Sequence, residues 1–279
     1  MKGQLSAVVI CRNEEKNIAR CIQSLEAVSD DIIVIDNFSS DKTVEIARKY
    51  TKNVYQFKWN GYSTQKNIGN SFAKHDFVLS IDADEMLSPE LCENINRTMK
   101  DPKFDAYAFL FLNWFGNRPI AHGGWHNEWH VRLFRRSRIC WNDFQVHEKL
   151  TVSKTAIKRL DGYIHHFTTT SRASYRKKMD RYAREFAFGR RERNCFSPVW
   201  KKYLSAGFRF FKEYILEVGF LDGKAGLIIA LEETRYTYLK YKMSEKSYKN
   251  SRTVPINPSL KISLQKRASD KSKLRKFAR

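Results

Sequence analysis

The N-terminal third of the chain alternates two patterns of apolar residues. Short β-branched runs, typical of strands buried on both faces, occupy residues 5–11, 31–36, 54–57 and 77–81. Between them, apolar side chains recur at the spacing of an amphipathic helix over residues 18–25, 43–50 and 63–73. Because strands that alternate with helices form right-handed β/α units, the pattern predicts an α/β fold with a mostly parallel central sheet.

The pattern changes after residue 102. Further strand-like segments lie at residues 105–114, 131–134, 145–148 and 162–167, with a loop rich in Gly and His over 121–130. Helical periodicity dominates from residue 174 onward, first in a stripe of Tyr175, Met179, Tyr182 and Phe186 and then over 200–218 and 224–241. Residues 251–279 are rich in Ser, Lys and Arg and have no period, which predicts a disordered tail.

The charge of the chain is uneven. It has 51 Lys+Arg against 30 Asp+Glu, a net charge of +21. Residues 1–112 carry −2, residues 113–239 carry +12 and residues 240–279 carry +11. Such a basic region calls for an anionic partner, and nucleic acid, anionic lipid and a phosphorylated substrate all satisfy that requirement. No apolar stretch reaches the roughly 18 residues of a spanning helix, so a membrane partner would be met at its surface.

Acidic and amide side chains follow three of the predicted strands. Asp82 and Asp84 leave the strand at 77–81, and two carboxylates at this spacing can bind one Mg²⁺ or Mn²⁺ that neutralises a diphosphate. The alternative is that they only cap a turn. Asp36 ends a neighbouring strand and can accept from the N–H of a base, while Asn13 and Glu14 follow the first strand. Since parallel strands end at one edge of a sheet, a nucleotide pocket is predicted there.

Two further basic motifs have an open interpretation. Lys66 lies in a K-N-x-G motif within a predicted helix, where it either meets a phosphate or belongs to a solvated face, and Gly69 permits close packing. His165 and His166 lie at the end of a predicted strand. They either bind a metal or contact the diphosphate, or they are a strand-end pair in which one histidine lies in the core and the other is exposed.

The loop at 121–130 suggests an acceptor site. His122, His126 and His130 are spaced by four, which on a helix would suit zinc, but the glycines and tryptophans between them favour a loop. Trp125 and His126 are therefore expected to stack on a sugar acceptor. Arg132 either holds an acceptor phosphate or forms an ion pair.

Several segments together resemble a known family. LSAVVICRNEEKNIARCIQSL, DDIIVIDNFSSDKTVEIA and QKNIGNSFAKHDFVLSIDADEML resemble family 2 glycosyltransferases of the GT-A fold, in the same order and spacing. WHNEWHVRLFRR, VHEKL, GYIHHF and SAGFRFFKEYILEVGFLDGKAGLIIA are similar to a subgroup that contains lipopolysaccharide core β-1,4-glucosyltransferases.

The resemblance implies roles for the residues at the strand ends. It implies that Asn13 and Glu14 line the nucleotide pocket and that Asp36 meets uracil. It further implies that Asp82 contacts the ribose or the metal and that Asp84 is the principal metal ligand. The chain departs from the family in having Asn37-Phe38-Ser39 where members usually have a small residue, so the aromatic ring is expected to alter base stacking.

An inverting transfer also needs a general base for the acceptor hydroxyl. Many family members carry Glu-Asp at the position of the base, whereas this chain has His147-Glu148. Glu148 is the expected base and Asp143 the second choice, the alternative for Glu148 being an ion pair with an arginine.

These observations predict a metal-dependent hexosyltransferase that uses a UDP-sugar, with glucose as the expected sugar, and a lipid-linked oligosaccharide acceptor of the lipopolysaccharide inner core. Residues 1–112 are expected to bind the donor, 113–172 the acceptor, and 173–250 to form a basic helical region before the tail at 251–279. Five scattered cysteines without a C-x-x-C pair favour the cytoplasm. The basic helices either lie on the anionic inner face of the inner membrane or pack on the core.

Two alternatives remain open at this point. A polyprenyl-phosphate sugar synthase, or another cell-surface polysaccharide glycosyltransferase, would share the N-terminal motifs. A nucleic-acid binder would exploit the charge of +21 and would bind less tightly in salt, but it leaves the acidic strand ends unexplained, so no nucleic acid is expected.

Overall fold

The computed structural model of the protein describes residues 4–141, 150–152, 157–192 and 199–253. Contacts divide the chain into two units, Met1–Ser171 and Arg172–Arg279. The predicted boundary at 112/113 lies inside a strand of the first unit. The predicted tail lies almost wholly outside the described residues.

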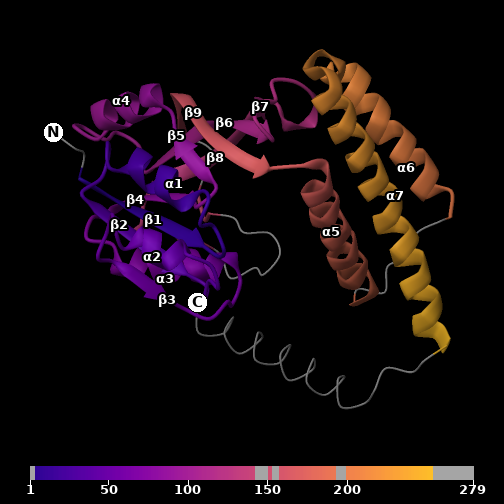
Figure 1. Cartoon of the computed structure of the whole chain (residues 1–279), viewed down its shortest axis with the longest axis horizontal. Helices are drawn as coiled ribbons and strands as arrows, with labels where there is room; N and C mark the ends of the chain where they lie inside the picture. The colour runs from indigo at the N-terminus through magenta and orange to yellow at the C-terminus, as the bar shows by residue number, and fades with distance from the viewer. Residues whose placement is uncertain (1–3, 142–149, 153–156, 193–198, 254–279) are drawn as a thin grey trace. The chain divides into compact units, whose positions relative to one another are not determined.

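A nine-stranded sheet forms the centre of the first unit (Figure 1). The strands are β1 (Leu5–Cys11), β2 (Asp31–Asp36), β3 (Val54–Gln56), β4 (Phe77–Asp82), β5 (Glu85–Leu87), β6 (Ala106–Phe115), β7 (Arg118–Pro119), β8 (Glu128–Arg135) and β9 (Ile157–Thr169). They lie in the order β3-β2-β1-β4-β8-β6-β9-β5, with β7 added to β6. The first four are mutually parallel, β8 joins β4 antiparallel, and β9 lies parallel to β6. This mixed sheet confirms the predicted α/β fold of GT-A type.

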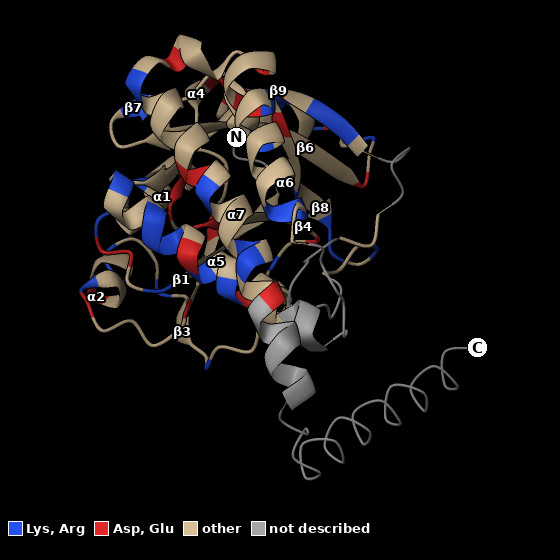
Figure 2. Ribbon diagram, turned by 90° about the vertical axis from the view of Figure 1, so that its right-hand side faces the viewer, with Lys and Arg blue, Asp and Glu red and all other residues tan. Residues whose placement is uncertain are grey.

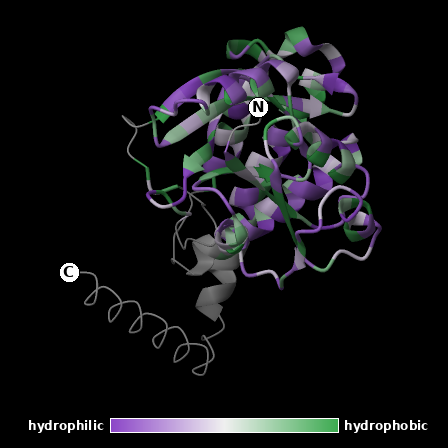
Figure 3. Ribbon diagram, turned by 90° about the vertical axis from the view of Figure 1, so that its left-hand side faces the viewer, coloured by the Kyte–Doolittle hydropathy of each residue, from purple (hydrophilic) through white to green (hydrophobic). Residues whose placement is uncertain are grey.

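The parallel strands bring the polar strand ends together. All seven residues of β1 and all six of β2 are buried, as their apolar runs predict. Figure 3 shows this hydrophobic character along strands inside the first unit. In the register, Cys11 lies opposite Asp36 and Ile10 opposite Asp82. Asp36 and Asp82 therefore end at one edge of the sheet, on either side of β1.

Helices flank the sheet of the first unit. They are α1 (Ile18–Leu25), α2 (Thr43–Ala47), α3 (Tyr62–Phe72) and α4 (Pro89–Thr98). The first three occur where the helical spacing predicts them, although α2 ends three residues earlier than expected. Helix α4 and strand β5 were absent from the prediction. The signal for α4 is present, because Ser88 accepts a hydrogen bond from the backbone of Leu91 as an N-cap and Pro89 occupies the first turn.

The second half of the first unit differs in detail from the prediction. Strand β8 already begins at Glu128, so the predicted loop is shorter and contains the short 3₁₀ helix η1 (Gly123–Trp125). Strand β9 extends over 13 residues, longer than the predicted 162–167. Both strands gain their length by pairing with β6, which is a long-range contact that local periodicity does not report.

The second unit is helical (Figure 1). It contains α5 (Arg172–Glu192), α6 (Lys201–Phe210), the π-helix η3 (Phe211–Leu216), the 3₁₀ turn η4 (Gly219–Asp222) and α7 (Gly223–Thr253). Helix α7 contacts both α5 and α6. Residues 172–279 contain 28 Lys+Arg and 10 Asp+Glu, and Figure 2 shows Lys and Arg along the described helices.

The aromatic stripe of α5 packs inside this unit. Tyr175 and Met179 are buried, the hydroxyl of Tyr175 donates to Glu233 of α7, and Phe186 lies edge-on against Tyr241 of α7. The stripe therefore faces α7 within the second unit. No helix in the described part of the chain combines the length and the apolar character that crossing a bilayer requires.

Candidate active site

The loops that follow β1 and β2 are joined by hydrogen bonds. The backbone N–H of Asn13 donates to Oγ of Ser39 (2.8 Å), and its side-chain Oδ1 accepts from the backbone N–H of Ser40 (2.8 Å). The backbone N–H of Glu14 donates to Oγ1 of Thr43 (2.7 Å). Asn13 adopts a left-handed conformation with φ 56°, which asparagine tolerates. The structure thus brings Asn13 and Glu14 beside the end of β2, as predicted.

Asp36, which is predicted to meet uracil, is held by contacts within the chain. Its side chain is fully buried, and its carboxylate accepts from the backbone and hydroxyl of Ser39, from Nε2 of Gln56 (2.9 Å) and from the thiol of Cys11 (3.5 Å). A carboxylate offers about four acceptor positions, and all are in use. Asp36 therefore fixes the turn after β2, and its contact with uracil stays a prediction. Phe38, in the same turn, is left-handed (φ 47°) and exposed.

Asp82, at the end of β4, is held by two cations. Lys66 of α3 places Nζ 3.4 Å from Oδ1, and Arg132 of β8 places Nη2 3.1 Å from Oδ2. Burial alone would raise the pKa of Asp82, but the charges of Lys66 and Arg132 outweigh it and hold that pKa well below its usual range. Both oxygens of Asp82 thus face protein cations. Of the two roles open for Arg132, the structure shows the ion pair.

Glu85 completes this buried charge cluster. It is 1% exposed, and Arg132 donates to its Oε1 while its Oε2 accepts from the backbone N–H of Asp82 (3.0 Å). Burial raises the pKa of Glu85 to about 7, with the nearby carboxylate of Asp82 adding to the effect. Lys66 is fully buried and also lies 4.6 Å from the ring centre of Trp141, so it belongs to the interior rather than to a solvated face.

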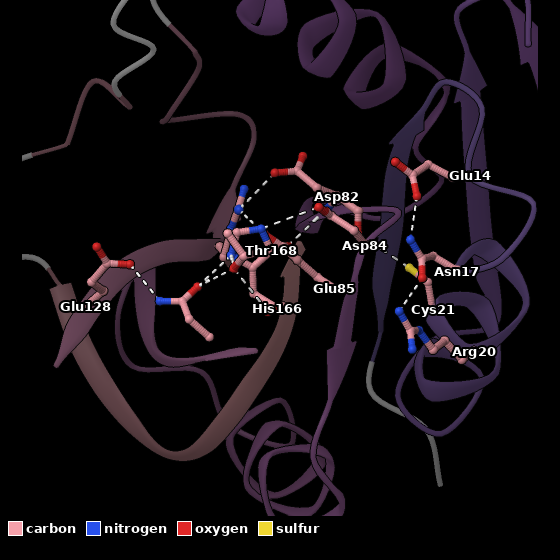
Figure 4. A network of polar contacts seen from close by, with 12 residues as sticks. Glu14, Asn17, Arg20, Cys21, Asp82, Asp84, Glu85, Glu128, His166 and Thr168 are labelled. Carbon is pink, nitrogen blue, oxygen red and sulfur yellow. Dashed lines mark hydrogen bonds and ion pairs between the residues drawn. The ribbon is translucent and has the colours of Figure 1, made fainter. Parts of the chain in front are cut away.

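Asp84 faces a histidine from β9. Its Oδ2 lies 3.4 Å from Nε2 of His166, and both side chains are partly exposed (Figure 4). Behind the ring, Nδ1 of His166 lies 2.8 Å from Oδ1 of Asn113. The amide of Asn113 is oriented by its Nδ2, which donates to the carbonyl of Trp125 (3.1 Å) and to Glu128 (3.0 Å). The network therefore places a proton on Nδ1 of His166. Nε2 then carries a lone pair in the neutral ring, and it donates an N–H toward the carboxylate of Asp84 only when the ring is charged.

The carboxylate of Glu14 lies near the same edge. It accepts from Nδ2 of Asn17 (2.6 Å), as Figure 4 shows. Burial raises the pKa of Glu14 above its ordinary value, and the charge of Asp84 contributes in the same direction. A carboxyl group whose pKa is raised by burial and by a nearby acidic group is a common sign of a functional site.

The residues present fit a divalent cation bound together with a diphosphate. Among the described residues no three His, Cys, Asp or Glu side chains gather closely enough to hold a metal by themselves. Mg²⁺ sites, however, commonly use only one or two protein ligands beside substrate phosphates, with ligands at about 2.1 Å. Oδ2 of Asp84 and Nε2 of His166, 3.4 Å apart, are close to the roughly 3 Å that separates adjacent ligands of an octahedral ion.

The predicted acceptor residues are only partly assembled. Trp125 is buried and lies against Phe115, whereas His126 is exposed. The rings of His122 and His126 are 6.4 Å apart, and the loop forms no zinc cluster with the histidines that the structure describes. The two expected bases, Asp143 and Glu148, lie outside the described residues.

Two residues of the site, Glu85 and Asn113, were not predicted, although each is marked by a pattern in the sequence. Glu85 directly follows Asp82-Ala83-Asp84, where a third acidic group is unusual. Asn113 is the one polar residue in the apolar segment 106–115, and it is 3% exposed. A lone buried polar residue in a strand needs hydrogen-bond partners, which here are the groups that hold His166 in place.

Part of the chain is similar in sequence to known glycosyltransferases. An uncharacterised glycosyltransferase of Rickettsia typhi is 41% identical over 104 residues, which are 37% of this chain and 36% of that protein. LpsC, a lipopolysaccharide core biosynthesis glycosyltransferase of Rhizobium meliloti, is 30% identical over 144 residues, 50% of this chain and 51% of LpsC. The chain thus matches between about a third and about half of the length of these curated relatives.

Similarity to solved structures and to family models completes the comparison. The crystal structure of S. aureus TarS 1-349 in complex with UDP-GlcNAc has 17% identity and a TM-score of 0.44, over 90% of this chain and 92% of that one. The family model for glycosyl transferase family 2 matches residues 6–183, from β1 into α5. Because this match spans more than half of the chain, the chain belongs to glycosyl transferase family 2.

Proposed function

We propose that the protein transfers a hexose, specifically glucose, from a UDP-sugar to the inner core of a lipopolysaccharide, with inversion at the anomeric carbon. Membership of glycosyl transferase family 2 supports the sugar transfer. The printed function of LpsC, lipopolysaccharide core biosynthesis, supports the class of acceptor.

The observation that carries the proposal is the pair formed by Asp84 and His166. The pair lies at the edge of the sheet where β1, β2 and β4 end, beside the loops that contain Asn13 and Glu14. Donor diphosphates bind at this edge of parallel sheets. The carboxylate suits Mg²⁺ or Mn²⁺, whereas the imidazole, fixed through Asn113, is a ligand more typical of transition metals and so favours Mn²⁺ of the two.

Each residue of the cluster has its own part in this proposal. Asp84 and His166 would hold the cation, which when bound stabilises the charge on the departing diphosphate. Asp82 is oriented by Lys66 and Arg132, so it is placed to meet the ribose. Glu148, or failing it Asp143, takes the proton of the acceptor hydroxyl as the general base.

The acceptor class also sets the location. A lipid-linked oligosaccharide under assembly lies in a membrane, so we place the enzyme at the cytoplasmic face of the inner membrane. The charge of residues 172–279, with 28 basic against 10 acidic residues, supports an anionic surface as partner.

The test combines a substrate panel with one matched pair of variants. The protein is incubated with nucleotide sugars, Mn²⁺ and truncated lipopolysaccharide, and the product is weighed by mass spectrometry. Asp84→Ala is expected to abolish transfer and to remove the rise in melting temperature that UDP with Mn²⁺ gives the wild type. Asp101→Ala, at a highly exposed carboxylate, is expected to retain both.

Three results would overturn the proposal. The first is activity of Asp84→Ala near that of the wild type, and the second is wild-type activity that persists with the metal chelated. The third is a single sugar recovered on a prenyl phosphate, which would favour the synthase instead.

A further inference from the structure

The helical unit has an apolar outer face. Along α6 and η3, six large apolar side chains are 44–66% exposed, and we call them the outer face: Tyr203, Leu204, Phe208, Phe211, Ile215 and Leu216. They recur about every four residues, so they lie along one side of the helix. Two lysines have the spacing of that side: Lys212 pairs with Glu217 (3.4 Å), and Nζ of Lys201 lies 5.3 Å from the ring centre of Tyr241 of α7.

Most other charged residues of the same helix point inward. Glu213 is 2% exposed and pairs with Arg209 (3.0 Å), which also pairs with Glu233 of α7 (3.0 Å). Lys202 likewise pairs with Glu245 of α7 (2.8 Å). Water-soluble helices place charge outside and apolar residues inside, so the polarity of this helix is reversed. Contiguous exposed apolar surface of this kind marks an interaction site.

The turn that joins α6 to α7 continues the outer face. Val218, Phe220 and Leu221 are 38–59% exposed, at a position where turns are usually polar. Val218 adopts a left-handed conformation (φ 51°). This conformation is rare for a β-branched residue. An apolar turn at the tip of a helical hairpin is suited to contact with the apolar part of a bilayer. The exposed Lys224 lies next to this turn.

Charge decides between possible occupants of this face. Residues 172–279 have 28 basic and 10 acidic side chains, a net charge of +18, while residues 1–171 have 23 and 20, a net charge of +3. A second copy would bring two strongly basic units together, and the first unit offers no opposite charge. An anionic lipid surface satisfies both the apolar face and the net positive charge of residues 172–279.

We propose that the outer face and the turn at Val218–Leu221 embed in the interfacial region of an anionic lipid bilayer, with the hairpin of α6 and α7 lying on the membrane. This identifies the surface through which the membrane location in the proposed function is achieved. The binding test needs neither donor nor acceptor. Failure of vesicle binding and failure of sugar transfer are therefore separate results.

The experiment compares substitutions of side chains with similar exposed fractions in the full-length protein. Binding is measured by flotation with vesicles of phosphatidylcholine containing phosphatidylglycerol, and with pure phosphatidylcholine. The triple variant Leu204→Ser/Phe208→Ser/Leu216→Ser is expected to lose more than tenfold in partitioning to the anionic vesicles. Phe188→Ser is the control, since Phe188 of α5 is 62% exposed against 63% for Phe208, and it is expected to stay within twofold of the wild type.

Trp200 supplies a second readout. It precedes α6 and is 61% exposed, next to the outer face. Brominated lipids are expected to quench its fluorescence on binding, so quenching should be clearly smaller in Trp200→Phe. Binding through charge alone would leave Trp200 in water and unquenched, even where flotation succeeds.

Five outcomes would overturn the proposal. They are equal vesicle binding by the triple variant and the wild type, equal losses in the triple variant and Phe188→Ser, and quenching unchanged by Trp200→Phe. The fourth is a dimer of the wild type that the triple variant dissolves, which would assign the face to a second copy. A fall in the melting temperature of the triple variant without lipid would likewise show that the face is covered by protein.

Discussion

The buried cluster around Asp82 allows the effect of burial on an ion pair to be measured within one protein. Lys66 and Asp82 are 3.4 Å apart, and the Lys66 side chain is fully buried. Lys74 and Asp30 are 3.6 Å apart, with the Lys74 side chain 66% exposed. Both pairs belong to the first unit and differ mainly in solvent access. The perturbation is Lys66→Met, with Lys74→Met as its matched control.

The expected magnitude follows from these distances. Two unit charges 3.4 Å apart attract by about 5 kcal/mol at an effective dielectric constant of about 20. Removing one partner of a fully buried pair costs about 3–5 kcal/mol. Here Arg132 still neutralises Asp82, and Asp82 is 29% exposed, so part of that cost is relieved. We expect Lys66→Met to lower the free energy of unfolding by about 2 kcal/mol and Lys74→Met by about 0.5 kcal/mol.

Urea unfolding followed by tryptophan fluorescence measures this difference in the intact chain. Five of the six tryptophans lie in residues 1–171, so the signal reports mainly on the first unit. The pKa of Asp82 is held well below its usual range, so its stabilising contribution is present above the ordinary pKa and is lost as pH falls through the lowered one. The gap between wild type and Lys66→Met should therefore be full at pH 5–7 and shrink below about pH 4. Equal losses of unfolding free energy in Lys66→Met and Lys74→Met would refute the reasoning. So would a difference between wild type and Lys66→Met that stays constant at acid pH.

Two further predictions concern stability. In Gly69→Ala the new Cβ would lie 2.2 Å from Cγ1 of Val8, so urea unfolding should show a free energy of unfolding lower by about 1–3 kcal/mol. In Gly207→Ala the new Cβ would have nothing within 4 Å, so the free energy of unfolding should rise by about 0.5–1 kcal/mol. A loss in both would contradict the packing argument. Burial raises the pKa of Glu85 to about 7, so the free energy of unfolding of the wild type should fall by up to about 3 kcal/mol as pH rises from 4.5 to 7. Glu85→Gln should lack this dependence, and parallel pH profiles of the two proteins would show that Glu85 does not titrate there.

The sequence predicts the strands around the site more accurately than the contacts between them. The bounds of β1 and β2 follow from their apolar runs, because strands buried on both faces need such residues and polar turns end them. The convergence of Asp36, Asp82 and Asn13 at one edge follows from the parallel topology. What each carboxylate meets there does not follow, because Arg132 reaches Asp82 from a strand 50 residues further along the chain.

Asp36 shows why the type of residue at a strand end is insufficient evidence for its role. A carboxylate in this position suits a uracil N–H, and the resemblance to the family implies that contact. In the structure the short turn after β2 folds back, so that the backbone and hydroxyl of Ser39 and the amide of Gln56 occupy the oxygens first. The outcome depends on tertiary pairing of β2 with β3, which brings Gln56 opposite Asp36.

The two aspartates of the D-x-D motif therefore have different electrostatic environments. Asp82 is neutralised from within by Lys66 and Arg132, so a cation bound to it would have to compete with two positive charges. Asp84 pairs with His166, a residue type whose neutral ring can bind a metal through Nε2, and interacts at longer range with the charge of Arg20. The proposed divalent ion is therefore expected on the Asp84 side of the motif. Under the proposed function the two carboxylates then divide the work, with orientation of the donor by Asp82 and charge neutralisation through Asp84.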